Sequence, residues 1–160
     1  DAQQQTYLPA FTGDDVAVAA LCLAEPTVLF DPLAPGTTAL RDGDDFVLDG
    51  VKSGVVRGAE AELFVVSASL DGTPALFLVE PGAAGLEVEA DPSMGLRAAS
   101  LSRLHLRGVR VPADALLGDA DGTAHAECVR LSRLAWCARD PRRRWRRWIR
   151  WSHPRCSCWR

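Results

Sequence analysis

Frequent turn signals are the feature that most limits what this chain can fold into. Asp42-Gly43 and Asp71-Gly72 each stand between two apolar runs, as two-residue β-hairpin turns do, and Pro81-Gly82 marks a further turn. The runs between the turns are too short and too rich in β-branched residues for helices. Between residues 16 and 111 the pattern therefore predicts a mostly β fold of about seven or eight short strands, arranged as a barrel or a sandwich.

Most of these strands can be assigned to residue ranges. The stretch 16–23 is apolar enough for a buried strand. Shorter strands are expected at 46–48, 55–56, 63–66 and 76–79. In a longer strand at 104–111, apolar and polar residues alternate until the phase slips by one residue at Gly108, as at a β-bulge.

One amphipathic helix is expected after the strands, from Ala124 to about Cys137, with Asp121 or Thr123 as its N-terminal cap. Its apolar face consists of Cys128, Leu131, Leu134 and Ala135. Because nothing in the chain is expected to cover this face, we interpret residues 119–138 as the start of a C-terminal helical domain. Residues 16–118 are then the β domain, and residues 1–15, which open without a Met or a signal peptide, the end of an N-terminal helical domain or a linker.

The charge of the chain changes sign near residue 138. Residues 1–138 carry 20 acidic and 9 basic side chains, a balance of −11, whereas residues 139–160 carry nine arginines and one acid, a balance of +8. All 24 alanines lie before residue 139, and all five tryptophans lie between 136 and 160. The 17 arginines and single lysine suggest GC-rich coding DNA. Out-of-frame reading of such DNA favours Arg, Trp, Cys and Pro, so we interpret residues 139–160 as a tail that is non-native or read out of frame.

Functional interpretations of this tail stay open beside that one. Trp145, Trp148 and Trp151 could form one helical stripe flanked by arginines, which would suit an anionic membrane surface or phosphate backbones. The candidate zinc ligands are His153, Cys156, Cys158 and Cys137, although their spacing matches no common zinc finger.

Six short motifs in the body of the chain share an order and spacing. They are Gln5-Thr6-Tyr7-Leu8-Pro9, Leu23-Ala24-Glu25-Pro26, Gly50-Val51-Lys52, Met94-Gly95-Leu96-Arg97, Val109-Arg110-Val111-Pro112 and Leu116-Leu117-Gly118. Together they resemble the middle β-barrel domain of the acyl-CoA dehydrogenase family, over about residues 3 to 137. The fold expected from this resemblance is a small β-barrel followed by a C-terminal helix.

The resemblance implies an FAD-dependent enzyme that desaturates an acyl-CoA thioester between Cα and Cβ. In the family, a carboxylate from the C-terminal helical domain removes the α-proton, and flavin N5 takes the β-hydride. The expected partners are the acyl-CoA substrate, further subunits of a homo- or hetero-oligomer and an electron-transfer partner. No catalytic residue is expected within this chain, which we predict to be inactive alone.

Two segments of the family's barrel touch the flavin, and both differ here. The resemblance assigns cofactor contacts to Leu23, Ala24, Glu25, Val55 and Val56, and substrate contacts to Phe30 and Asp31. Ala24 replaces a threonine of the family and Phe30 a serine. Gly54 replaces an aromatic residue and Val56 a hydroxyl residue. Because several hydroxyl groups are lost together, we expect the FAD site to be degraded or rearranged.

Several polar residues have a structural interpretation beside a functional one. Glu25 is expected to be a loop or cap residue rather than a catalytic acid, and Asp31 a structural residue that accepts backbone N–H bonds. Lys52 is expected to be solvated at a strand end, with a ligand phosphate as the alternative. Arg97 is expected to pair with a surface acid, and His105 to face solvent.

For the remaining histidine, methionine and cysteine candidates, no catalytic or ligand-binding role is expected. His125 opens the helix without a nucleophile nearby, and Met94 is expected in the core. Cys22 and Cys128 lie in apolar surroundings and are interpreted as reduced core residues, which suits a cytoplasmic protein. No metal site is expected in the body of the chain.

Two further functions remain as alternatives. One is a non-catalytic subunit that completes the site of another subunit in a hetero-oligomeric acyl-CoA dehydrogenase. The other is a protein whose cationic tail binds membranes or nucleic acid. The leading interpretation involves neither nucleic acid nor a membrane span.

Overall fold

The computed structural model describes residues 2–12, 16–93, 95 and 97–138. Its contacts group the chain into two units, Asp1–Ala126 and Glu127–Arg160. All seven strands of the described residues belong to the first unit. They are β1 (Ala19–Cys22), β2 (Thr38–Asp42), β3 (Asp45–Val56), β4 (Leu63–Leu70), β5 (Thr73–Val79), β6 (Leu86–Ala90) and β7 (Leu101–Val111).

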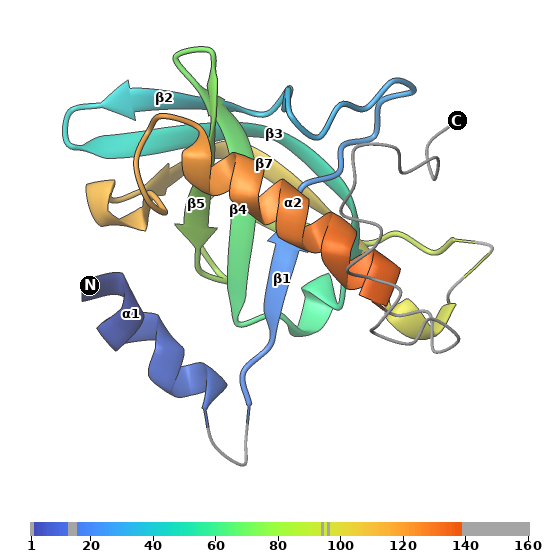
Figure 1. Cartoon of the computed structure of the whole chain (residues 1–160). Helices are drawn as coiled ribbons and strands as arrows, with labels where there is room; N and C mark the ends of the chain where they lie inside the picture. The colour runs from blue at the N-terminus through green and yellow to red at the C-terminus, as the bar shows by residue number, and fades with distance from the viewer. Residues whose placement is uncertain (1, 13–15, 94, 96, 139–160) are drawn as a thin grey trace, which may run out of the picture. The chain divides into compact units, whose positions relative to one another are not determined.

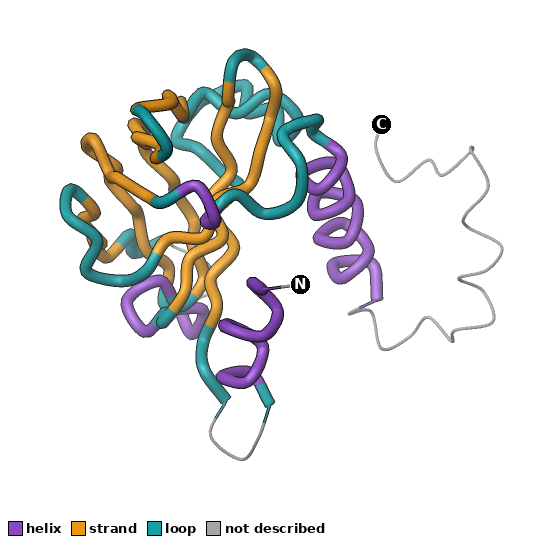
Figure 2. The backbone as a smooth tube through the Cα atoms, turned by 90° about the vertical axis from the view of Figure 1, so that its left-hand side faces the viewer, coloured by secondary structure: helices purple, strands orange, loops and turns teal. Residues whose placement is uncertain are grey.

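One curled sheet contains these seven strands. Six of them follow the order β1-β4-β2-β3-β7-β6, and the seventh, β5, lies outside this order and pairs with β4. β4 runs parallel to β1 and β2 and antiparallel to β5. β3 and β5 are not neighbours in the sheet, yet the rings of Phe46 and Phe77 meet edge to face with centroids 5.1 Å apart. This contact requires the sheet to curl (Figures 1 and 2). The expected mostly β, barrel-like fold with a C-terminal helix is confirmed.

The apolar core fills the inside of this curl. It draws on six of the strands, with Cys22, Leu48, Phe64, Phe77 and Leu104 all inaccessible to solvent. The charged residues of the outer face pair across strands instead, as between Arg107 and Glu87 on β7 and β6, 2.9 Å apart. Burial of the inner face is what holds the barrel together.

The predicted hairpins at Asp42-Gly43 and Asp71-Gly72 join β2 to β3 and β4 to β5, as expected. The bulge predicted at Gly108 is also confirmed. Leu48 pairs with Val109 but Gly50 pairs with Leu106, so β7 carries one extra residue there. Gly108 has a left-handed φ of 63°, and its N–H donates to Asp49 Oδ1 at 2.8 Å.

Other strand predictions need correction. The stretches 46–48 and 55–56 belong to one strand, β3, because the glycines between them shift the register with β7 without ending the ladder. β1 begins at Ala19 rather than at residue 16. β6 was not assigned from the sequence, although its alternating Leu86-Glu87-Val88-Glu89-Ala90 pattern is typical of a strand with one buried face.

Among the described residues, two α-helices stand before and after the strands in the sequence. α1 (Ala2–Tyr7) leads into a 3-10 turn, η1 (Leu8–Phe11), that begins just before Pro9. α2 (Thr123–Ala138) matches the predicted helix, and Asp121 Oδ1 accepts the N–H of Thr123 at 2.8 Å, in an Asx turn just before the helix begins. No helix in the described ranges is both long and apolar enough to cross a membrane.

Candidate functional site

The two segments that the family resemblance associates with flavin lie side by side. The first follows β1, and the second is the last part of β3. A backbone hydrogen bond of 3.0 Å from Ser53 N–H to the carbonyl of Ala24 joins them. Among the described strands, none pairs with this edge of β3 beyond Asp49, which leaves Ser53 free to bond the segment after β1. Two segments whose bonded residues, Ala24 and Ser53, lie 29 positions apart in the sequence thus lie side by side.

Glu25 lies at the centre of this junction, and its carboxylate accepts four hydrogen bonds. Oε2 accepts the N–H of Gly36 at 2.8 Å. Oε1 accepts the N–H and the hydroxyl of Thr37 at 2.9 and 2.7 Å and Lys52 Nζ at 2.7 Å. Burial alone would raise the pKa of the Glu25 carboxyl, but these hydrogen bonds outweigh it and lower the pKa to about 2. These bonds support the interpretation of Glu25 as a loop or cap residue rather than a catalytic acid.

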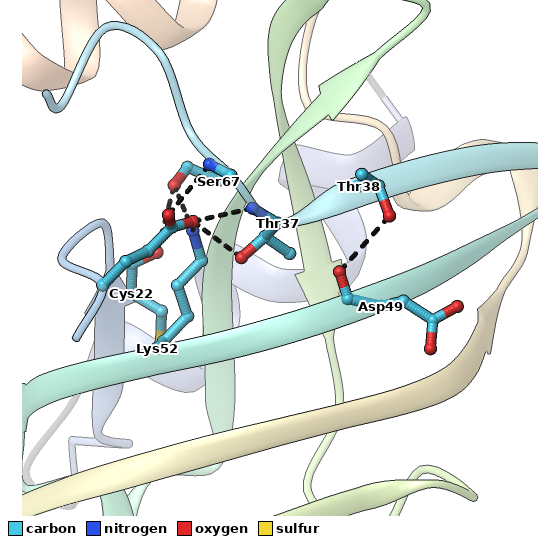
Figure 3. Close-up of polar contacts among 8 residues, drawn as sticks. Cys22, Thr37, Thr38, Asp49, Lys52 and Ser67 are labelled. Carbon is cyan, nitrogen blue, oxygen red and sulfur yellow. Dashed lines mark hydrogen bonds and ion pairs between the residues drawn. The ribbon is translucent and has the colours of Figure 1, made fainter. Parts of the chain in front are cut away.

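Lys52 is the chain's single lysine and is completely buried, with 0% of its side chain exposed against 7% for Glu25. Its Nζ donates to Glu25 Oε1 and, at 2.9 Å, to Ser67 Oγ, toward which it reaches from β3 (Figure 3). Burial lowers the pKa of Lys52, and the hydrogen bond and charge of Glu25 oppose that effect. The expectation of a solvated lysine or a phosphate ligand is wrong, because the partner carboxylate lies 27 positions away and only the fold brings it near.

The bulky apolar residues in the loop between Glu25 and Thr37 are at least partly exposed to solvent rather than packed in the core. Val28 and Leu29 are fully exposed, and Phe30 is half-buried. Asp31 Oδ1 accepts the N–H of Leu33 at 2.9 Å, as in an Asx turn, which supports the structural interpretation of this residue. The loop therefore offers apolar contact area to any neighbour.

The end of β3 alternates between core and solvent. Val55 is buried in the core, so its side chain cannot reach a ligand on the outer surface, whereas Val56 is half exposed. Gly54, in a left-handed conformation, leaves open space where a side chain would stand. Leu23 and Ala24 are half-buried. Among the residues assigned to the cofactor, Leu23, Ala24 and Val56 have accessible side chains, and they carry no hydroxyl group.

His125 lies in the first turn of α2, and its side chain is buried. It is 0% exposed, and neither ring nitrogen has a hydrogen-bond partner among the described residues. Burial, and secondarily the charge of Lys52, lowers the pKa of His125. No signal in the local sequence marks it, since its burial depends on distant residues. His105, by contrast, lies on the outer face of β7, 3.3 Å from Glu89, as its alternation with leucines predicts.

The cysteines differ in burial. Cys22 belongs to the core, as expected, and burial raises the pKa of its thiol to about 12, which makes it a poor nucleophile. Cys128 is only half-buried, and burial raises its pKa too. Both are free thiols. The described residues contain no group of three or more His, Cys, Asp or Glu that could hold a metal ion.

Several sequence-based expectations fall outside the described residues or side chains. They concern Met94, Arg97, the candidate zinc ligands Cys137, His153, Cys156 and Cys158, and the tryptophan stripe of the tail.

Comparison with known proteins places this site in a family. Residues 20–109 match the family model "Acyl-CoA dehydrogenase, middle domain". The chain is 35% identical over 132 residues to cyclohex-1-ene-1-carbonyl-CoA dehydrogenase of Geobacter metallireducens, which covers 79% of the chain and 34% of that protein. It is 34% identical over 124 residues to the human short-chain specific acyl-CoA dehydrogenase, mitochondrial, covering 73% of the chain and 30% of that protein.

Solved structures show the same relationship. A glutaryl-CoA dehydrogenase from Mycobacterium smegmatis, solved in complex with FADH2, superposes with a TM-score of 0.71 at 32% identity, over 78% of this chain and 32% of that one. A second structure of glutaryl-CoA dehydrogenase from this species gives a TM-score of 0.73 at 32% identity, over 81% and 34%. The chain spans about a third of the length of the curated relatives it matches.

Proposed function

The chain belongs to the acyl-CoA dehydrogenase family, and we propose that it forms the flavin-facing middle barrel of an FAD-dependent enzyme that oxidises an acyl-CoA thioester. The observation that carries this proposal is the pairing of the segment after β1 with the end of β3, through Ser53 and Ala24. Both segments lie within the matched range 20–109.

The residues at this surface offer a flavin apolar contact and backbone approach, but side-chain hydroxyl groups are missing at two positions. Ala24, Val56 and the backbone around the open Gly54 offer apolar area and close backbone approach to a flat ring. Side-chain hydroxyls are missing at positions 24 and 56. When bound, FAD would supply the two-electron oxidation. The chain's own residues would hold the ring by backbone and apolar contacts, more weakly than a site with hydroxyl donors.

The acid at the centre of this surface, Glu25, is not suited to act as the base. Glu25 is saturated by four donors, and its pKa of about 2 makes it a poor proton acceptor. We therefore assign the barrel the task of binding and orienting the cofactor, and expect the base that removes the α-proton to come from outside the described residues.

A flavin titration tests this proposal. We expect the purified chain to quench FAD fluorescence in a saturable way, and Val56→Glu to weaken that binding by placing a charge on the flavin-facing surface. Leu40→Glu is the matched control, because Leu40 is exposed on β2 and takes no part in this surface. We expect no acyl-CoA-dependent dye reduction by the chain alone. The absence of quenching would refute the cofactor assignment. Dye reduction by the chain alone would refute the assignment of the base to a part outside the described residues.

A second candidate function is that of a non-catalytic subunit that completes another subunit's site. It is favoured by the loss of hydroxyls together with the fully exposed Val28 and Leu29, which offer apolar area to a partner. Co-expression with a complete homologue distinguishes the two candidates. A partner subunit would co-purify with the homologue and bring no flavin of its own, giving half as many flavins as subunits.

A further inference from the structure

The hydrogen bonds around Glu25 connect three separate parts of the chain. Glu25 stands at the start of the loop after β1, and Gly36 and Thr37, which donate to it, stand at the loop's end. Lys52 joins the carboxylate to β3, and through Ser67 to β4. We call the group Glu25, Gly36, Thr37, Lys52 and Ser67 the Glu25 cluster.

Thr37 extends this connection by its backbone. Its carbonyl accepts the N–H of Ser69 on β4 at 2.8 Å, and Thr37 is almost completely buried. On β3, a Cβ at Gly50 would lie 2.6 Å from Thr37 Oγ1 and 2.8 Å from Thr37 Cα. The end of the loop therefore packs directly against the backbone of β3.

The Lys52–Glu25 ion pair is the side-chain link between the loop and β3 in this cluster. Among the described residues, the two segments are also joined by the backbone hydrogen bond from Ser53 to Ala24, one residue from each member of the pair. A hydrogen bond at a strand edge opens easily unless neighbouring contacts hold its two sides. A buried ion pair supplies such a contact, because parting its charges leaves each one unpaired in a place with little water.

We propose that the Lys52–Glu25 pair is a latch that holds the segment after β1 against the end of β3, and so positions the two segments that face the flavin. Its value for flavin binding rests on the function proposed above, whereas its effect on the two segments does not. Lys52 and Glu25 are positioning residues in this proposal, and neither is assigned contact with the cofactor.

Hydrogen exchange of the full chain tests the latch without any cofactor. The reporter is the Ser53 amide, because its bond to the Ala24 carbonyl joins two backbone groups that remain present in every side-chain variant. In Lys52→Met we expect its protection, relative to amides of β7, to fall at least about tenfold. Glu25→Gln combined with Lys52→Met leaves no unpaired buried charge, so it serves as the second variant if Lys52→Met does not fold.

A matched control separates the latch from general loss of stability. Val79→Ala removes buried volume on β5, outside the Glu25 cluster, so it should lower the protection of Ser53 and of β7 together. An unchanged ratio of Ser53 to β7 protection in the double variant would overturn the latch.

Flavin titration of the same variants adds a second readout. We expect the double variant to bind FAD at least about tenfold more weakly than the wild type, and Val79→Ala to bind it equally well. If the wild type quenches no FAD fluorescence, the proposed cofactor is wrong, and the Ser53 exchange still decides the latch. If the double variant loses Ser53 protection but binds FAD normally, the segments are latched without consequence for the flavin, and the positioning role is overturned.

Discussion

Lys52 shows how much a single residue's role depends on its surroundings. A lysine side chain is long, flexible and strongly hydrated, so its complete burial requires an acceptor to replace water. Here Glu25 and Ser67 supply that replacement. Removing one partner of such a buried pair typically costs about 3–5 kcal/mol, whereas replacing both can be nearly neutral. The pair is therefore better understood as setting a geometry than as adding net stability.

At the same scale, His125 is expected to make folding sensitive to mild acid. Its folded pKa lies below the ordinary 6.5, because burial and the charge of Lys52 disfavour the protonated ring. Below about pH 6.5, His125 is therefore protonated more readily in the unfolded chain than in the folded chain. The free energy of unfolding should fall as the pH drops through this range. We expect His125→Phe to flatten this dependence between about pH 6.5 and 5, as measured by urea unfolding at a series of pH values.

His105→Gln is the control for that measurement, since His105 lies on the outer face beside Glu89. It should leave the acid dependence in place. If His105→Gln removed the dependence and His125→Phe did not, the assignment to the buried histidine would be wrong.

A second residue-scale prediction concerns the missing hydroxyls. Ala24→Thr combined with Val56→Thr should tighten FAD binding, by roughly fivefold for each hydrogen bond gained at about 1 kcal/mol. Ala24→Val is the matched control, because valine has the shape of threonine without its hydroxyl and should not tighten binding. The dissociation constants follow from fluorescence titration. Equal affinities for the double variant and the control would show that these positions do not face the flavin's polar atoms.

At the scale of elements, β3 stays one strand because its ladder with β7 continues across two register shifts near Gly50 and Gly54. Gly50 is the position where Thr37 crosses the strand, and a side chain there would collide with the backbone of Thr37. The same close approach brings Thr37 within reach of Glu25. One small residue thus determines where the loop can join the strand.

We expect Gly50→Ala to lower the free energy of unfolding by at least about 2 kcal/mol, through strained backbone and steric overlap together. Gly43→Ala is the matched control. Gly43 also has a positive φ, of 66°, but open space surrounds the position of its missing side chain. It should cost about 1 kcal/mol, from the backbone alone. Urea midpoints of the two variants give the comparison, and equal losses would argue against the close approach at Gly50.

At the scale of the whole molecule, the chain combines a strongly acidic body with a strongly basic tail. The core cluster consists of residues between 20 and 115, all within the acidic part. Stability of the barrel should therefore not depend on residues 139–160. Their charge of +8 would act instead on polyanions, with binding that weakens steeply as salt rises.

A chain ending at Ala138 tests this division. Its urea midpoint should equal that of the full chain, because the core cluster of the described residues is formed by residues 20 to 115. Binding to heparin should be salt-dependent in the full chain and absent in the shortened one. A lower midpoint for the shortened chain would show that the tail contributes to the fold, and salt-independent binding would remove the electrostatic interpretation.

Interactions between residues close in the sequence determined the turns and the bulge of this protein. Turns depend on residues next to one another, so Asp42-Gly43, Asp71-Gly72 and the bulge at Gly108 were predictable from their neighbours. The order of motifs along the chain also indicated the barrel and the two segments that the family resemblance associates with flavin. The continuous length of β3 was not predictable from its glycines, because the ladder with β7 holds the strand together across them.

Only the tertiary structure decided the environment of the charged groups. The carboxylate that neutralises Lys52 lies 27 positions before it, and the hydroxyl of Ser67 lies 15 positions after it. Their meeting is set by the register and curl of the sheet, which no local pattern records. The burial of His125 and the separation of Val55 from Val56 into core and surface follow from the same long-range packing. Residue types and spacing determined which groups were present, and the folded sheet decided which of them meet.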